Sequence, residues 1–341
     1  MSGHDASPIR ATRPRLTRPD GFFPFWRETL DALGRVPAHP RPGLAVTSPE
    51  GARIVPVRFA SLGGCDIQGF LITLDDPEDA ASANSAAGGF SAARSATAGR
   101  RPLVVTTHGY NGQCNPVLEA RHTATCGADL FCFDVRGFGL SRSACPVDPL
   151  GYILTGLTDP CTSILRGAVC DYVRAAEVAQ RLGAGRGGMV FHGRSYGGAL
   201  AFLAQGLTSR ADYLAVALPT FGWVDGRRQL VTRGSGQEVN DHLTRHPRLE
   251  AAAMATLRYF DTVNVADRIA CPTLIGVARR DEVVPAATVY AIANHMDPPP
   301  EIVELPVGHS TDEEERRWVD FDERWTAAVA ALGTTAPATR R

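Results

Sequence analysis

Hydrophobic residues recur along this chain in two alternating patterns. Short apolar runs rich in β-branched residues predict strands at residues 53–59, 67–73, 103–107, 130–133, 188–192, 215–218, 273–277 and 302–305. Apolar residues at helical spacing predict helices at residues 22–33, 164–182, 199–207, 286–294 and 313–331. Strands that alternate with helices predict an α/β protein whose mostly parallel, doubly wound sheet carries helices on both faces.

Three segments depart from this alternation and define the expected domain organisation. Residues 1–20 contain Arg and Pro but few apolar residues, which predicts a flexible N-terminal arm. Residues 76–101 are low in complexity, as is typical of a long surface loop inserted between two strands. Residues from about 221 to 260 are charged and helical in pattern, and predict a small helical cap on the carboxyl side of the sheet. We therefore expect one domain over residues 21–333, followed by a disordered tail at 334–341.

The composition excludes several classes of protein and of partner. With 341 residues, 44% of them hydrophobic and 21% charged, the chain is neither a collagen, a coiled coil nor a fully disordered protein. A net charge of −1 gives no electrostatic argument for nucleic acid or an anionic membrane as partner. All 35 basic residues are arginine, so no lysine is present for Schiff-base chemistry or for a phosphate-binding loop.

The cysteines and the N-terminal sequence favour a cytoplasmic location. None of the eight cysteines forms a C-x-x-C pair, and a chain of this length does not need disulfides for stability. The N-terminal residues lack the apolar core of a secretory signal. No apolar run approaches the roughly 18 residues of a transmembrane helix. We expect reduced thiols in a cytoplasmic protein.

The strongest chemical signal is the sequence Gly-Arg-Ser-Tyr-Gly at residues 193–197, which has the form G-x-S-x-G. It lies directly after one predicted strand and directly before a predicted helix, as a nucleophile elbow requires. Small residues on both sides allow the sharp turn that exposes the serine hydroxyl near the positive end of the helix dipole. The pattern predicts Ser195 as a nucleophile.

A serine hydroxyl needs a base to take its proton, and this elbow is typically followed in the chain by an acid and then a histidine. Asp281 lies on the loop after the strand at 273–277, with Glu282 beside it as an alternative acid. His309 follows the next strand, at 302–305. We expect His309 to act as the base and Asp281 to hold its imidazole.

The third requirement is a pair of N–H donors for a developing oxyanion. One donor is expected to be the backbone N–H of Tyr196, directly after the nucleophile. The second is expected to be that of Tyr110, on the loop His108-Gly109-Tyr110 after the strand at 103–107. We interpret His108 as a residue that orders this loop, and this chemistry requires no metal or organic cofactor.

Beyond the elbow, the chain resembles the acetyl xylan esterase / cephalosporin-C deacetylase family of α/β-hydrolases. The matching segments follow the family's order from about residue 20 to 332: residues 20–26, 108–110, 134–137, 151–156, 168–175, 258–261, 264–269 and 308–309. The resemblance implies an α/β-hydrolase fold, with Ser195, Asp281 and His309 as the catalytic triad. It also implies the Tyr110 and Tyr196 N–H groups as the oxyanion hole, small acetyl esters of sugars as substrates, and assembly into homo-oligomers.

Three motifs of the family differ here at a neighbouring position. Phe138 and Tyr196 stand where the family usually has glutamine, and Ser310 stands where it usually has glutamate. We expect a serine esterase or deacetylase acting on a small-molecule ester. Acyl transfer, lactone chemistry or peptidase-like cleavage in specialised metabolism is the alternative, and a non-catalytic binding module is a lesser one.

Overall fold

The computed structural model describes residues 8–74, 101–309 and 318–334. Within this part of the chain, a ten-stranded sheet has the order β1-β3-β4-β6-β5-β7-β8-β9-β10, with β2 paired to β3. The strands are β1 (Arg41–Pro42), β2 (Val46–Thr47), β3 (Ala52–Ala60), β4 (Asp66–Leu74), β5 (Leu103–Thr107), β6 (Asp129–Asp134), β7 (Met189–Arg194), β8 (Tyr213–Ala217), β9 (Thr273–Ala278) and β10 (Glu301–Leu305). All pairings from β6 to β10 are parallel, and those of β1 to β4 are antiparallel. The predicted α/β architecture with a mostly parallel sheet is confirmed.

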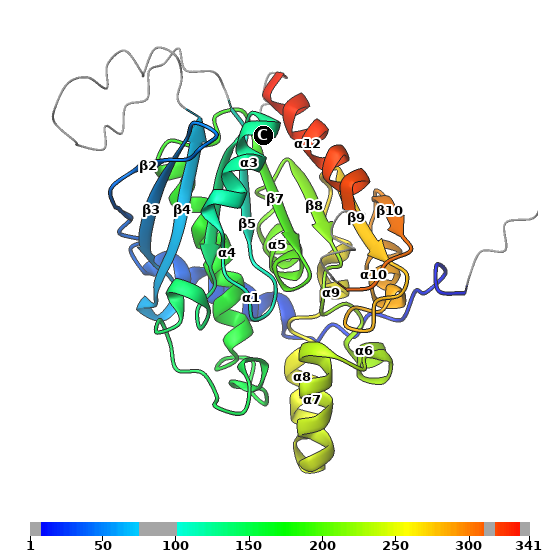
Figure 1. The fold of residues 1–341 in the computed structure, drawn as a ribbon. Helices are drawn as coiled ribbons and strands as arrows, with labels where there is room; N and C mark the ends of the chain where they lie inside the picture. Colours follow the sequence, from blue (N-terminus) through cyan, green and yellow to red (C-terminus); the bar gives the residue numbers. More distant parts are fainter. Residues whose placement is uncertain (1–7, 75–100, 310–317, 335–341) are drawn as a thin grey trace, which may run out of the picture.

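Helices cover both faces of this sheet (Figure 1). On one face, α3 (Pro116–Cys126) packs beside α12 (Val319–Thr334). The other face carries α1 (Phe22–Arg35), α4 (Ile164–Arg181), α5 (Tyr196–Thr208), α9 (Val263–Ala266) and α10 (Ala286–Ala293). The middle strands are buried between these layers, so their sequences are continuous apolar runs, as expected for parallel strands covered on both sides.

Helix α3 was not predicted from the sequence. Its buried residues Ala120, Thr123 and Cys126 are small, and they give little apolar periodicity. Its ends are nevertheless well defined. The side chain of Asn115 accepts hydrogen bonds from the first turn, and Gly127 ends the helix in the left-handed conformation at φ 63°.

The N-terminal segment, expected to be a loose arm, makes specific contacts over its described residues 8–20. Arg10 donates a 3.0 Å hydrogen bond to Glu304 on β10, and Arg18 forms a 2.6 Å ion pair with Asp267. Asn294, directly after α10, donates to the carbonyl of Thr12. Residues 76–100 of the predicted insertion and 335–341 of the predicted tail lie outside the described residues. Residues 313–317 of the helix predicted at 313–331 also lie outside the described residues.

The segment predicted to form a cap contains three helices between β8 and β9. They are α6 (Val224–Leu230), α7 (Gly234–Arg245) and α8 (Glu250–Leu257). In Figure 1, α7 and α8 project from the sheet beyond the end at which β8 points. Among the helices that the structure describes, none is both long enough and apolar enough to cross a membrane.

Candidate active site

Ser195 occupies a strained turn between β7 and α5. Its backbone has φ 53° and ψ −114°, a conformation that residues other than glycine rarely adopt. The Ser195 N–H donates to the carbonyl of Ala217 at 2.8 Å, which ties the turn to β8. A Cβ atom on Gly197 would lie 2.5 Å from the carbonyl oxygen of Thr107, so only glycine fits there. The turn has the features predicted for a nucleophile elbow.

Three predicted residues from separate loops form one hydrogen-bonded chain. The Ser195 hydroxyl lies 3.1 Å from Nε2 of His309, and Nδ1 of His309 lies 2.7 Å from Oδ2 of Asp281. In this arrangement the serine O–H donates to the imidazole, which in turn donates to the carboxylate. Such a chain lets an imidazole take the proton from a serine as its oxygen attacks a carbonyl carbon.

The Asp281 side chain is completely buried, and donors surround its carboxylate. While Oδ2 accepts from His309, Oδ1 accepts from the backbone N–H groups of Val283 and Val284 at 2.8 and 2.9 Å. Glu282, the alternative acid, is 63% exposed and lies 3.8 Å from Arg233 instead. The structure therefore brings Asp281, and not its neighbour, to the histidine.

The two residues predicted to supply oxyanion donors lie side by side. Tyr196 is the first residue of α5, where backbone N–H groups have no partner within the helix. Tyr110 lies on the loop after β5, and its ring meets that of Tyr196 edge-on with 5.8 Å between the centroids.

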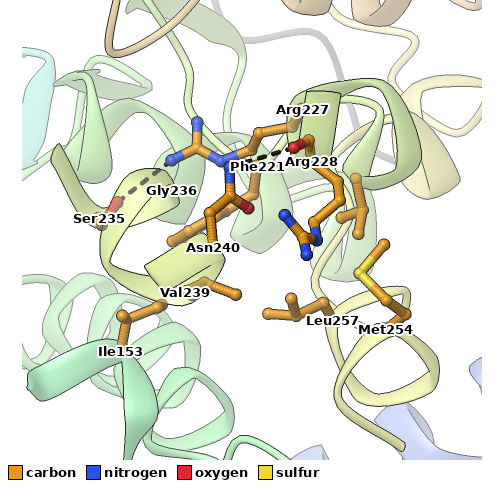
Figure 2. A pocket seen from close by; sticks show the side chains of 11 residues that line it. Ile153, Phe221, Arg227, Arg228, Ser235, Gly236, Val239, Asn240, Met254 and Leu257 are labelled. Atoms are coloured by element: carbon orange, nitrogen blue, oxygen red, sulfur yellow. Dashed lines mark hydrogen bonds between the residues drawn. The ribbon is translucent and has the colours of Figure 1, made fainter. Parts of the chain in front are cut away.

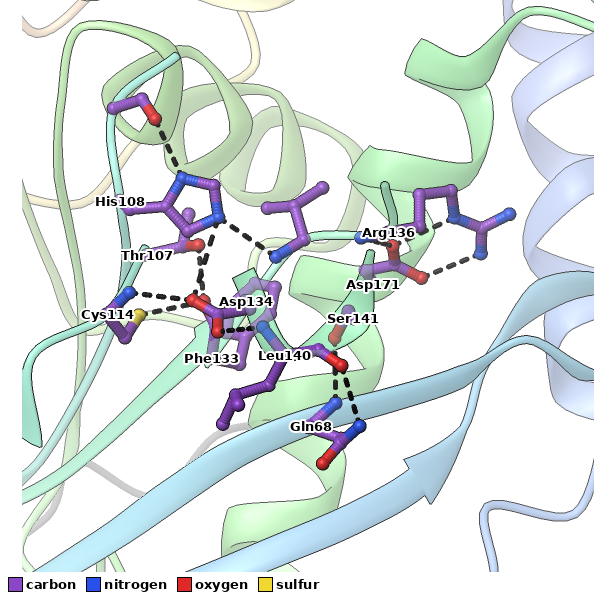
Figure 3. Close-up of polar contacts among 12 residues, drawn as sticks. Gln68, Thr107, His108, Cys114, Phe133, Asp134, Arg136, Leu140, Ser141 and Asp171 are labelled. Carbon is purple, nitrogen blue, oxygen red and sulfur yellow. Dashed lines mark hydrogen bonds and ion pairs between the residues drawn. The ribbon is translucent and has the colours of Figure 1, made fainter. Parts of the chain in front are cut away.

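His108 shapes the loop that carries Tyr110 (Figure 3). Its Nδ1 lies 2.7 Å from the carbonyl of Gly109, and the N–H of Val135 donates to its Nε2 at 3.1 Å. These bonds require a neutral imidazole with the proton on Nδ1. Burial lowers the pKa of His108, whereas the carbonyl of Gly109 and the nearby Asp134 oppose the shift. Both ring nitrogens of His108 are thus used in hydrogen bonds that order the loop.

The segment after β6 is held by two buried carboxylates (Figure 3). Asp134 accepts from the N–H of Cys114 on the Tyr110 loop at 2.7 Å and from the N–H of Leu140 at 2.8 Å. Arg136 donates to both oxygens of Asp171 on α4, at 2.9 and 2.7 Å. The motif at residues 134–137 therefore positions loops around the serine and does not itself reach the serine–histidine pair.

Two of the departures from the family pattern meet in one aromatic cluster. Phe138 stacks on Tyr152 with 4.1 Å between ring centroids, and the Tyr152 hydroxyl lies 2.9 Å from that of Tyr196. Tyr110 contacts all three rings edge-on. Aromatic packing and a phenol pair thus occupy the two positions at which the family usually has glutamine.

Helices α6, α7 and α8, together with Ile153 and Phe221, line a cavity of about 30 Å³ (Figure 2). Arg227 lies at its edge and is buried, and it donates to the carbonyl of Val283 at 3.3 Å and to Ser235 at 3.2 Å. Burial lowers the pKa of Arg227 to about 10, and the carboxylates of Asp281 and Asp261 act in the opposite direction. This arginine therefore places a positive charge near the acid that holds His309.

Sequence reasoning missed two residues near the site. Arg227 and Glu238 belong to the charged segment that was interpreted only as a cap, and neither lies in a motif. Glu238 accepts a 3.0 Å hydrogen bond from the hydroxyl of Tyr110. Glu238 meets Tyr110 across 128 residues and Arg227 meets Val283 across 56, so no local signal links these pairs.

Comparison with known proteins gives one family match, one curated relative and two similar solved structures. A family model described as acetyl xylan esterase (AXE1) matches residues 6–315. The acetyl esterase Axe7A of Xylanibacter ruminicola is 30% identical over 159 residues, which cover 46% of this chain and 35% of that protein. The match therefore spans about a third of that relative's length.

Two solved structures superpose on nearly the whole chain. The acetyl xylan esterase from Paenibacillus sp. R4 has a TM-score of 0.81 and 25% identity, covering 95% of this chain and 99% of its own. Acetyl Xylan Esterase 1 from Thermoanaerobacterium sp. JW/SL YS485 has a TM-score of 0.79 and 20% identity, covering 96% and 99%. The predicted α/β-hydrolase fold is confirmed by both. Because the family model covers nearly the whole sequence, the chain belongs to the acetyl xylan esterase (AXE1) family.

Proposed function

We propose that this protein is a serine carboxylesterase or deacetylase that hydrolyses small acyl esters, acetyl esters of sugars above all, through an acyl-enzyme. The single observation that carries the proposal is the hydrogen-bonded chain from Ser195 through His309 to Asp281. The family and its acetyl esterase relatives support the substrate class.

In the first half of the reaction, Oγ of Ser195 attacks the ester carbonyl carbon and His309 takes its proton. The carbonyl oxygen becomes an oxyanion, which accepts hydrogen bonds from the N–H groups of Tyr110 and Tyr196. The carbon–oxygen bond to the alcohol then breaks, and His309 gives its proton to the leaving alcohol. Asp281 stabilises the imidazolium and fixes its orientation throughout.

In the second half, a water molecule attacks the acyl-enzyme while His309 takes a proton from it. The bond to Oγ breaks, the proton returns to Ser195, and the carboxylic acid leaves. The imidazole is 27% exposed, so solvent reaches the base. This exposure favours hydrolysis over acyl transfer, which requires that water be excluded.

The proposal includes a cytoplasmic location and a small-molecule ester as partner. All eight cysteines are free thiols, which fits a reducing compartment. The proposal also includes assembly into a homo-oligomer, which the family resemblance implies. Light scattering of the purified protein measures its oligomeric state.

The test compares p-nitrophenyl acetate, butyrate and octanoate with wild type and Ser195→Ala. We expect fast acetate hydrolysis that falls with chain length and drops by about 10⁴-fold or more in the variant. Ser143→Ala, at an exposed serine, is the control and should keep full activity. Turnover that does not depend on Ser195 would contradict the proposal. Acetylated xylo-oligosaccharides then test the substrate class.

A further inference from the structure

The side chain of Tyr110 makes two hydrogen bonds in addition to the role proposed for its backbone N–H. Its phenol donates a 3.0 Å hydrogen bond to Oε2 of Glu238 on α7 and accepts a 3.2 Å bond from the N–H of Ile153. The residue predicted to supply an oxyanion donor is therefore anchored at its far end to the cap and to the short helix η3 (Tyr152–Leu154).

Glu238 is built into this position rather than resting on the surface. It is half-buried, and its Oε1 is enclosed with no hydrogen-bond partner among the described residues. Gly151 leaves the space, since a Cβ atom there would overlap the Glu238 carboxylate. An enclosed, partly unpaired carboxylate is costly, and the one hydrogen bond that its side chain accepts within the described part of the chain is the bond from Tyr110.

The geometry points to Glu238 as a positioning residue that holds the oxyanion donor of Tyr110 in place through the Tyr110 phenol. The inference rests on the proposed function, because it takes the Tyr110 N–H as that donor. A tyrosine ring is rigid, so a fixed hydroxyl restricts the backbone from which the ring extends. Through Glu238, the cap thus affects the position of the oxyanion donor, although Glu238 itself touches no reacting atom.

The expected magnitude follows from what one oxyanion donor contributes. Removing such a donor lowers kcat by about 10²–10³-fold, and a misplacement of about 1 Å has a similar effect. Loosening the anchor while keeping the donor should cost less. We expect Glu238→Ala to lower kcat on p-nitrophenyl acetate by roughly 10- to 100-fold, with KM changed less than threefold.

The test is a double-mutant cycle with Tyr110→Phe, Glu238→Ala and both together. If Glu238 acts through the phenol, each single variant lowers kcat and the double variant is no slower than Tyr110→Phe. Glu238→Gln keeps an acceptor oxygen and should retain at least a third of the wild-type kcat. Asp241→Ala, at an exposed acid on the same helix, should leave kcat unchanged.

The outcomes separate this inference from the proposed function. Multiplying effects in the double variant, or a kcat for Glu238→Ala equal to wild type, would overturn the positioning role while Ser195 dependence stands. Activity that survives Ser195→Ala would instead overturn the function itself. Should Glu238→Ala fail to fold, the near-isosteric variants Tyr110→Phe and Glu238→Gln still test the inference. It requires a lowered kcat for Tyr110→Phe and a kcat of at least a third of wild type for Glu238→Gln.

Discussion

The two carboxylates given roles in the proposed reaction, Asp281 and Glu238, are held in opposite ways. Asp281, at the edge of the sheet, is completely buried, and three donors reach its two oxygens. Glu238, on the cap, has one donor for Oε2, while Oε1 has no partner among the described residues. At the sheet edge, both oxygens of Asp281 are therefore held by hydrogen bonds. On the cap, Glu238 is held by one hydrogen bond from Tyr110, which a substitution can loosen.

This difference predicts how each region responds to change. At the sheet edge, substitutions of the acid should abolish most of kcat, because the backbone N–H groups of the loop after β9 hold its carboxylate in one position. On the cap and aromatic side, substitutions should reduce activity or stability by graded amounts. The following experiments address this contrast.

The largest effect is expected at Asp281. Asp281→Asn should lower kcat by about 10⁴-fold, because an amide no longer fixes the tautomer of His309 or stabilises its imidazolium. Steady-state kinetics on p-nitrophenyl acetate measure the loss. The control is Glu282→Gln, at the exposed neighbouring acid, which should keep wild-type activity. A large loss of kcat in Glu282→Gln with little loss in Asp281→Asn would identify Glu282 as the acid that holds His309.

The next effect concerns the elbow itself. Gly197→Ala places a methyl group 2.5 Å from the carbonyl oxygen of Thr107 and 3.0 Å from that of His108, both of which are backbone atoms. Overpacking of this kind should lower the free energy of unfolding by about 1–3 kcal/mol and displace Ser195. Urea unfolding and kcat measure the two losses.

Gly34→Ala is the matched control, since Gly34 lies in α1 with no atom near the added Cβ. It should raise stability by about 0.5–1 kcal/mol through helix propensity, with activity unchanged. Equal behaviour of the two variants would mean that the elbow is not tightly packed.

A third prediction tests the aromatic side. Tyr152→Phe leaves the buried hydroxyl of Tyr196 without its 2.9 Å partner, which should cost about 1–2 kcal/mol of unfolding free energy. The double variant Tyr152→Phe/Tyr196→Phe removes both hydroxyls, so its loss should be smaller than the sum of the two single losses. Strictly additive losses would show that the phenols do not stabilise one another. Activity should change less than tenfold, since the backbone donor of Tyr196 remains.

The elbow and the serine–histidine–acid chain were predictable because each signal is local. Ser195 lies in a five-residue motif with a strand before it and a helix after it, and Asp281 and His309 each follow an apolar run. The parallel sheet then brings these loops to one edge. The sequence alone left Glu282 open as the acid. The 2.7 Å contact of Asp281 with His309 and the exposed position of the Glu282 side chain decide against it.

The cap side was not predictable in the same way. The bond between Tyr110 and Glu238 joins residues 128 positions apart, and the phenol pair of Tyr152 and Tyr196 spans 44. No periodicity or motif links such positions, because their contact depends on how the cap packs on the sheet.

The smallest predicted effect concerns pH and the loop that carries Tyr110. His108 must stay neutral, because Nδ1–H donates to the carbonyl of Gly109 and Nε2 accepts from the N–H of Val135. Burial lowers the pKa of His108 in the folded protein, while an unfolded histidine titrates near a pKa of about 6.5. Below that pH the unfolded chain binds more protons than the folded one. The contribution of His108 is therefore fully present above about pH 6.5 and is lost as the pH falls, by at most about 1.4 kcal/mol per unit.

Replacing His108 isolates this contribution. His108→Asn should be less stable than wild type at pH 7, because it loses both bonds of the ring, yet its unfolding free energy should change less between pH 7 and pH 5. Urea unfolding at the two pH values measures the slope. His39→Asn, at an exposed histidine, should leave the slope of wild type unchanged. A slope for His108→Asn as steep as that of wild type would mean that the imidazole can accept a proton without breaking its bonds. The Tyr110 loop would then depend on its anchor at Glu238 more than on the histidine that begins it.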